Sequence, residues 1–142
     1  MGAQDSIRWV SQMPQQELFA LYRTMHCFLF PSLHDSSGNV VLEAQANGLP
    51  VVCLDVGGPA TLVTEDTAIV VATRNQNEAG VIQGLADAIR KLAHDEPGRV
   101  AMSRTAAERV REKMSWGERA NGVLPLVDKA LGRTWRGSVE DA

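Results

Sequence analysis

The sequence predicts an α/β fold in which a parallel sheet carries helices on both of its faces. Two short apolar runs, at 27–30 and 51–54, have the continuous hydrophobicity of strands that are buried on both faces, and a third run at 68–71 is also expected to form a strand. Segments with helical spacing lie between and after these runs, and such alternation is typical of parallel strands joined by crossover helices. A length of 142 residues suits one domain, so residues 1–142 are predicted to form a single domain.

The first part of the chain is predicted to contribute one strand and one helix. Residues 1–6, like 136–142 at the other end, are expected to be disordered, and 7–10 are expected to form a short strand. Pro14 opens a helix, because proline is well suited to the first helical position and Glu17 is favourable in the first turn. The apolar stripe expected for this helix comprises Leu18, Leu21, Tyr22 and Met25.

The middle of the chain is predicted to alternate strands with short helices. Pro31 stops the first apolar strand, Gly48 is a natural left-handed helix cap, and Gly57-Gly58 makes a turn that only small residues allow. The elements expected here are a strand at 27–30, a helix from Asn39 or Val40 to Gly48, a strand at 51–54, a single helical turn from Pro59 to Val63 and a strand at 68–71.

The rest of the chain is predicted to be helical. One helix spans 78–94, Pro97 opens a second, and a third begins near Ser115, with Trp116 either anchoring it or lying in the core. Pro125 removes a backbone donor, so Gly122 and Pro125 should interrupt and kink this last helix. The residues expected to face inward are Ile82, Leu85, Ile89 and Leu92 in the first of these helices, and Val100, Ala107, Val110 and Met114 in the second.

Composition argues against several classes of protein. The net charge of −3 argues against nucleic-acid binding, and no apolar run approaches the ~20 residues that span a membrane. The sequence does not open with a signal-peptide pattern, and Cys27 and Cys53 lie in apolar strands, where reduced thiols are the usual state. We therefore expect a cytoplasmic protein that binds no nucleic acid and has no membrane span.

The polar loop in the middle of the chain carries the candidate functional residues. Asp35 and Glu43 are eight residues apart with Gly38 between them, so one acid lies on the loop and the other lies one turn inside the following helix. A helix start at the carboxyl end of a strand favours anions, and two acids there can hold hydroxyl groups of a ligand whose phosphate lies on the helix amides. The pair is a poor metal site, because nothing else nearby donates.

Each of these residues also has a simpler interpretation. Glu43 could be a capping or solvent-facing helix residue, Asp35 could serve only to form the turn, and His34 could be a solvated loop residue rather than a catalytic one. The sequence has no Lys or Arg between Arg23 and Arg74, so a cation that neutralises a diphosphate must come from outside that span.

A longer pattern surrounds the two acids. From Pro31 onward the sequence follows Pro-Ser-x-x-acid-x-x-Gly-x-x-x-x-Glu-Ala-x-Ala-x-Gly-x-Pro-Val-Val, closed by Gly-Gly-Pro. This run resembles the donor-binding signature of retaining nucleotide-sugar glycosyltransferases of the GT-B fold, glycosyltransferase family four. The resemblance covers residues 7–135 and implies a Rossmann-like parallel sheet, the truncated C-terminal, nucleotide-sugar-binding half of such an enzyme. Asp35 stands where the signature usually has Glu, and Ser36-Ser37 stand where it usually has Gly-Phe.

The resemblance implies a role for each matching position. Asp35 takes the catalytic position that holds hydroxyl groups of the donor sugar, and Glu43 takes the position that holds the ribose. The resemblance also implies a UDP- or GDP-linked donor and a reaction that needs no cofactor and no metal. The sugar would be transferred, with retention of its configuration, to a glycan, polysaccharide or glycolipid, as in polysaccharide biosynthesis. The donor-binding positions, with backbone amides around Gly38 to Val40 against the sugar and diphosphate, are Ser36, Ser37, Gly38, Asn39, Val40 and Glu43.

The enzymes of the resembled family also have an N-terminal α/β domain, which this sequence lacks. That domain is the expected partner of this one, and in the family an Arg and a Lys upstream of the matching region serve the diphosphate. Peripheral membrane association of the parent protein is compatible with the resemblance. We therefore expect the 142-residue chain alone not to transfer sugar.

Two other classes of function stay open. One is a sugar-nucleotide epimerase of the same fold, which would make a new sugar nucleotide from the donor alone, without an acceptor. The other is a non-catalytic α/β module that binds a nucleotide or a partner, for which the absence of half the enzyme architecture is the supporting feature.

Overall fold

The described part of the chain comprises residues 6–114 and 116–132 of a computed structural model, without the side chains of Trp116 and Arg119. The segments predicted to be disordered, 1–6 and 136–142, lie outside the described residues except for Ser6. The predicted role of the Trp116 side chain also lies outside them. The elements are α1 (Gln15–Tyr22), β1 (Phe28–Phe30), α2 (Asn39–Ala46), β2 (Val51–Leu54), α3 (Gly57–Leu62), β3 (Ala68–Val71), α4 (Glu78–His94), α5 (Glu96–Lys113) and α6 (Trp116–Ala130).

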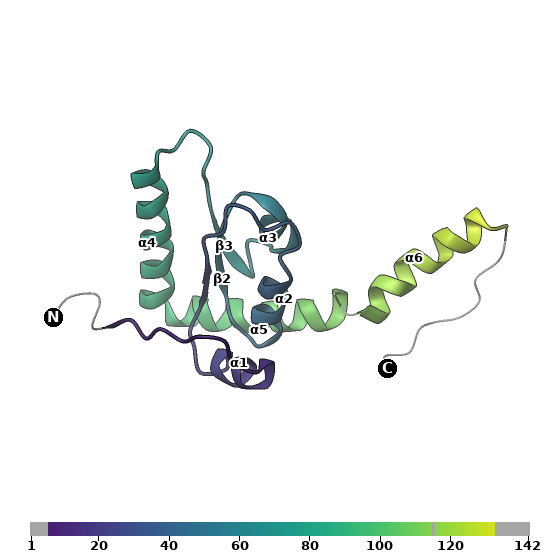
Figure 1. Cartoon of the computed structure of the whole chain (residues 1–142), viewed down its shortest axis with the longest axis horizontal. Helices are drawn as coiled ribbons and strands as arrows, with labels where there is room; N and C mark the ends of the chain where they lie inside the picture. The colour runs from purple at the N-terminus through teal and green to yellow at the C-terminus, as the bar shows by residue number, and fades with distance from the viewer. Residues whose placement is uncertain (1–5, 115, 133–142) are drawn as a thin grey trace.

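The three strands form one parallel sheet in the order β1-β2-β3. In the shared register Phe28 lies beside Val51, and Val51 lies beside Ala68. The central strand β2 is buried at all four of its residues. Each strand is connected to the next through a helix, as parallel pairing requires, and Figure 1 shows helices on either side of the sheet. The predicted α/β class is confirmed.

Alternate strand residues face two different helical layers, because successive side chains of a strand point to opposite faces. One face packs on α2 and the segment after α3, and the other packs on α4. Cys53 is buried on the first face and Cys27 packs at the edge of the second, so the sheet separates these two free thiols. The two clusters comprise Val41, Val51, Cys53, Val63 and Ala68 on one face, and Val52, Leu54, Val71, Ala88 and Leu92 on the other.

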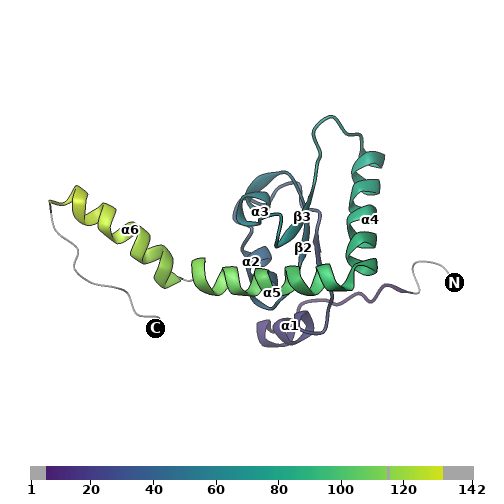
Figure 2. The ribbon, with the colours of Figure 1, turned by 180° about the vertical axis from the view of Figure 1, so that it is seen from behind.

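Helix α5 closes the amino edge of the sheet. Figures 1 and 2 show it running across that edge from the end of α4 towards α2. Three of its side chains donate hydrogen bonds to main-chain carbonyl groups that end α4 or precede β2 and β3. These bonds join Arg99 Nη1 to Leu92 O (2.7 Å), Ser103 Oγ to Gly48 O (2.5 Å) and Arg109 Nη1 to Leu62 O (2.7 Å). The carboxyl edge is thereby left to the loops.

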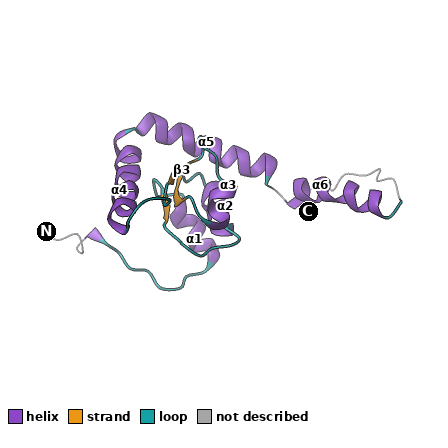
Figure 3. Ribbon diagram, turned by 90° about the horizontal axis from the view of Figure 1, so that it is seen from above, coloured by secondary structure: helices purple, strands orange, loops and turns teal. Residues whose placement is uncertain are grey.

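Helix α6 stands away from the sheet, as Figures 1 and 3 both show. It is continuous from Trp116 to Ala130, so the predicted interruption at Gly122 and Pro125 is wrong. One missing backbone hydrogen bond does not end a helix of 15 residues. Its apolar side chains Val123, Leu126 and Val127 are exposed.

Two predictions about the strands are wrong. Residues 7–10 form no strand, and Trp9 is 89% exposed, because a segment this short needs a neighbouring strand to complete its hydrogen bonds and no described strand lies beside it. Among the residues that the structure describes, the sheet therefore has three strands rather than four. The 27–30 run is not buried on both faces either, since Leu29 is 41% exposed. Of the described strands, β1 lies at an edge of the sheet, and α4 covers β2 and β3 instead.

The predicted helix stripes also need correction. Ile82 (58% exposed) and Ile89 are not in the core, and Val100 and Met25 are exposed as well. Pro14 is the N-cap residue that precedes α1 rather than its first residue. A 3.6-residue period leaves two adjacent apolar stripes on α4, and only one of them can face the sheet. That stripe consists of Val81, Leu85, Ala88 and Leu92.

Candidate functional site

Two loops meet at the carboxyl edge of the sheet. The polar loop of residues 31–38 leaves the end of β1, and Gly57 begins α3 three residues after Leu54, the last residue of β2. Parallel strands end at a common edge, and in open α/β sheets ligands bind at that edge. Figure 1 places α5 at the opposite edge.

Asp35 is partly buried, and its carboxylate turns back on its own loop. Its Oδ1 atom accepts hydrogen bonds from the backbone N–H groups of Ser37 (2.9 Å) and Gly38 (2.5 Å). This is the turn-forming role that the simpler interpretation of Asp35 predicts. The Oδ2 atom makes no hydrogen bond within the described residues.

The Gly57-Gly58 turn lies directly against this loop. The N–H group of Gly58 donates to the carbonyl oxygen of Asp35 at 2.9 Å. Further along the loop, Gly38 is buried against Pro59 and Leu62 of α3. Helix α3 therefore supports the loop from Asp35 to Gly38.

Helix α2 begins immediately after this loop, and its first backbone N–H groups lack hydrogen-bond partners among the described residues. Gly38 is its N-cap residue and has a left-handed backbone with a φ of 64°, and the first helical hydrogen bond joins Val41 N to Gly38 O (2.9 Å). The backbone N–H groups of Asn39 and Val40 have no hydrogen-bond partner among the described residues. Free N–H groups at a helix start are suited to an anion.

Glu43 lies one turn further along α2, near enough to Tyr22 of α1 for its charge to act on the Tyr22 hydroxyl. Tyr22 of α1 packs in one cluster with Ala44 and Leu49, and its ring lies 5.6 Å from that of Phe28. Burial raises the pKa of the Tyr22 hydroxyl, and the negative charge of Glu43 raises this pKa further. Tyr22 is thus a neighbour of the second acid that sequence reasoning assigned only to an apolar stripe.

A third acid joins two loops at the same edge. Thr73, after β3, donates to Oδ1 of Asp55, after β2, from both its backbone nitrogen (2.8 Å) and its Oγ1 (2.6 Å). These bonds lower the pKa of the Asp55 carboxyl, with a smaller contribution from the charge of Arg74. Arg74, which ends the cation-free span, therefore lies at the carboxyl edge.

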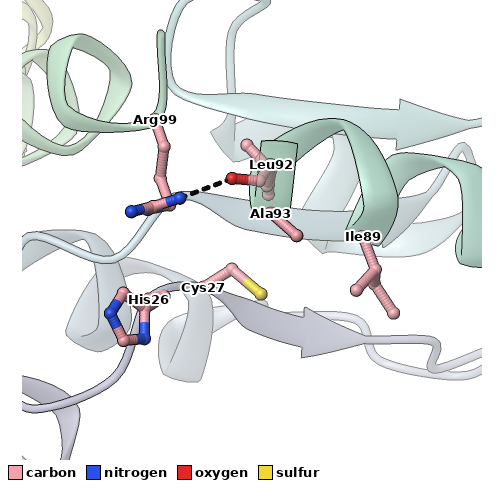
Figure 4. Close-up of a pocket in the computed structure, with 6 residues that line it drawn as sticks. All are labelled: His26, Cys27, Ile89, Leu92, Ala93 and Arg99. Carbon is pink, nitrogen blue, oxygen red and sulfur yellow. Dashed lines mark hydrogen bonds between the residues drawn. The ribbon is translucent and has the colours of Figure 1, made fainter. Parts of the chain in front are cut away.

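A separate pocket of about 380 Å³ lies at the amino edge of the sheet (Figure 4). Burial raises the pKa of the Cys27 thiol there, and the charge of Arg99 opposes this shift, so the thiol is not activated. None of the predicted site residues lines it. Its lining residues are His26, Cys27, Ile89, Leu92, Ala93 and Arg99.

The predicted site residues differ in exposure. Residues 35–40 lie together at the start of α2, and Glu43 follows one turn later; His34 is exposed. Within the described ranges, no three His, Cys, Asp or Glu side chains are placed to share a metal ion, and the prediction that no metal is needed stays a prediction. Gly38 is buried, Asp35, Val40 and Glu43 are partly buried, and Ser36, Ser37 and Asn39 are exposed.

A parallel sheet with a polar loop and a helix start at its carboxyl edge is the arrangement of a Rossmann-like α/β domain, in which ligands bind at that edge. The sequence model of the family described as "Glycosyl transferases group 1" matches residues 1–109. The chain belongs to this family, which confirms the resemblance drawn from the loop and helix signature.

Proteins named D-inositol 3-phosphate glycosyltransferase are similar to this chain. The one from Corynebacterium aurimucosum is 35% identical over 132 residues, which cover 92% of this chain and 30% of the relative. The one from Corynebacterium glutamicum is 32% identical, with the same two coverages, and the one from Kribbella flavida is 37% identical over 109 residues, 76% of this chain and 24% of the relative. The chain thus spans about 30% of the length of the first of these relatives.

Proposed function

We propose that this chain is the donor-binding part of a retaining glycosyltransferase that takes its sugar from a UDP- or GDP-linked donor. The observation that carries the proposal is the start of α2, where the Asn39 and Val40 amides are free and the family signature supplies an acid on either side. Those amides suit a diphosphate, and carboxylates suit the hydroxyl groups of a sugar and a ribose.

The proposed chemistry depends on positioning and electrostatic stabilisation rather than on a strong base. The Asn39 and Val40 amides would stabilise the diphosphate as the glycosidic bond breaks, together with cations from another part of the parent enzyme. The free Oδ2 atom of Asp35 would orient the sugar through its hydroxyl groups. Glu43, one turn deeper, would hold the ribose.

The acceptor side belongs to a part of the enzyme that this chain does not contain. The names of the relatives make D-inositol 3-phosphate the first acceptor to test, followed by glycan and glycolipid acceptors. No helix within the described residues combines the length and the apolar character needed to cross a bilayer. We propose a cytoplasmic parent enzyme, in which peripheral membrane association would accompany a lipid acceptor.

A transfer assay on the protein translated from the complete reading frame tests the proposal. With UDP- and GDP-sugars and an acceptor, the wild-type protein should form a product that keeps the anomeric configuration of the donor. A new sugar nucleotide formed from the donor alone would instead identify an epimerase, and donor binding without turnover would identify a binding module.

Glu43→Gln in the same protein checks the ribose assignment. The bonds of Glu43 would form in the ground state and persist in the transition state, so the change should mainly raise KM for the donor. A charge-assisted hydrogen bond is worth about 1.5–3 kcal/mol, so kcat/KM should fall roughly tenfold to a hundredfold. A fall in kcat at unchanged KM would contradict the assignment.

A further inference from the structure

The start of α3 touches the polar loop more closely than any side chain would allow. A Cβ atom added to Gly58 would lie far less than 3.0 Å from the carbonyl oxygen of Ser36 and 2.7 Å from its carbonyl carbon. A Cβ atom added to Gly57 would meet the carbonyl oxygen of Asp35 equally closely. Because real Cβ atoms essentially never come within 3.0 Å of such neighbours, only glycine at both positions permits this backbone contact.

Three further contacts hold the same loop. The Gly58 N–H group binds the carbonyl oxygen of Asp35 at 2.9 Å, and the Asp35 carboxylate binds the amides of Ser37 and Gly38. A Cβ atom on Gly38 would come within 2.8 Å of Leu62 Cδ1. The path of residues 35–38 is therefore fixed by a main-chain hydrogen bond, a side-chain turn and close packing against α3.

We propose that the Gly57-Gly58 pair is a positioning element for the donor, because it sets the path of residues 35–38 and hence the direction of the Asn39 and Val40 amides. The inference rests on the proposed function. A side chain at Gly58 would push the loop away from α3 and rotate the start of α2. The two amides would then no longer converge on the diphosphate, and the donor would bind more weakly.

Gly58→Ala isolates this effect, with Gly48→Ala as its matched control. Gly58 does not have a positive φ, so alanine there tests close approach without backbone strain. Gly48 has a φ of 79° and a neighbour, Ser103 Oγ, at 3.2 Å from an added Cβ atom, so alanine there also strains the chain. Gly48 lies at the far end of α2 and outside the proposed donor site.

Two measurements follow. In ¹H–¹⁵N NMR spectra of the 142-residue chain, the amide signals of residues 35–40 should move in Gly58→Ala and stay in place in Gly48→Ala. In the protein from the complete reading frame, KM for a UDP- or GDP-sugar should rise about tenfold in Gly58→Ala, the factor expected for about one lost hydrogen bond to the donor. A merely structural defect would lower the amount of active enzyme, and hence kcat, without moving KM.

The two arms separate the failure of this inference from the failure of the proposed function. Unmoved signals for residues 35–40 in Gly58→Ala would refute the positioning role whatever the activity. If the wild-type protein transfers sugar and the signals move in Gly58→Ala while its KM for the donor is unchanged, the position of the loop does not matter to donor binding. No transfer by the wild-type protein would refute the proposed function itself, and the link to the donor with it.

Discussion

Asp35 offers a test that separates its role in the loop from any role toward a ligand. Asp35→Ala removes the acceptor of two backbone N–H groups, those of Ser37 and Gly38. Ser37 is exposed and its amide can bind water, whereas Gly38 is buried and its amide cannot readily do so. By analogy with the loss of an N-cap side chain, the free energy of unfolding should fall by about 1–2 kcal/mol.

Asp35→Asn is the matched variant, because the amide oxygen of asparagine can accept the same two hydrogen bonds while the charge is removed. Its free energy of unfolding should stay within about 0.5 kcal/mol of the wild-type value. Urea unfolding followed by circular dichroism measures both variants, and with a slope of about 1–3 kcal/mol per molar the alanine variant should unfold at a midpoint lower by roughly 0.3–2 M. Equal midpoints for the alanine and asparagine variants would refute the assignment of Asp35 to the turn.

The comparison also decides how Asp35 is tested in catalysis. Any loss of activity in Asp35→Ala mixes a displaced loop with a missing carboxylate. The asparagine variant keeps the loop and changes only the charge, so a lower kcat in that variant would report on the sugar contact alone.

Two further predictions concern the packing and the acid titration of the domain. Leu92→Ala should lower the free energy of unfolding by about 2–5 kcal/mol, because Leu92 is only 4% exposed and packs against the sheet. Ile82→Ala, on the exposed side of the same helix, should change the free energy of unfolding by less than about 0.5 kcal/mol. Urea midpoints measure both variants, and equal losses would contradict the corrected stripe of α4. Thr73→Val removes a hydrogen bond that lowers the pKa of Asp55, so it should destabilise the domain at neutral pH. Because the folded protein lowers the pKa of Asp55, this carboxyl adds stability at pH values above its ordinary pKa of 3.8, and that stability is lost as the pH falls through the folded-state pKa. The difference in melting temperature between Thr73→Val and wild type should therefore shrink in strong acid. A difference that stays constant with pH would contradict this prediction.

The sequence was most informative where a pattern is local. Helix α4, β2 and β3 have the predicted bounds, and α2 ends beside Gly48 as the left-handed cap required. These elements are set by hydrophobic runs, caps and glycines within a few residues of one another. The same local patterns supplied the family signature and both interpretations of Asp35.

The sequence was least informative where a neighbour decides the outcome. Nothing in the run from 27 to 30 reveals that β1 lies at an edge and leaves Leu29 exposed. Nothing in the apolar residues of α4 reveals that Val81 rather than Ile82 faces the sheet. The proximity of Tyr22 to Glu43 and the contact of Gly58 with Asp35 depend on packing between separate elements, which no spacing rule encodes.

Helix α5 has a consequence for the order in which this domain can form during synthesis. Its hydrogen bonds reach back 55 residues, from Ser103 to Gly48, and 47 residues, from Arg109 to Leu62. A ribosome therefore releases all three strands before the helix that covers their amino ends. Until α5 emerges, the carbonyl groups of Gly48 and Leu62 must be satisfied by water, and the nascent sheet must wait for contacts that are distant in sequence, which are the slow ones in folding.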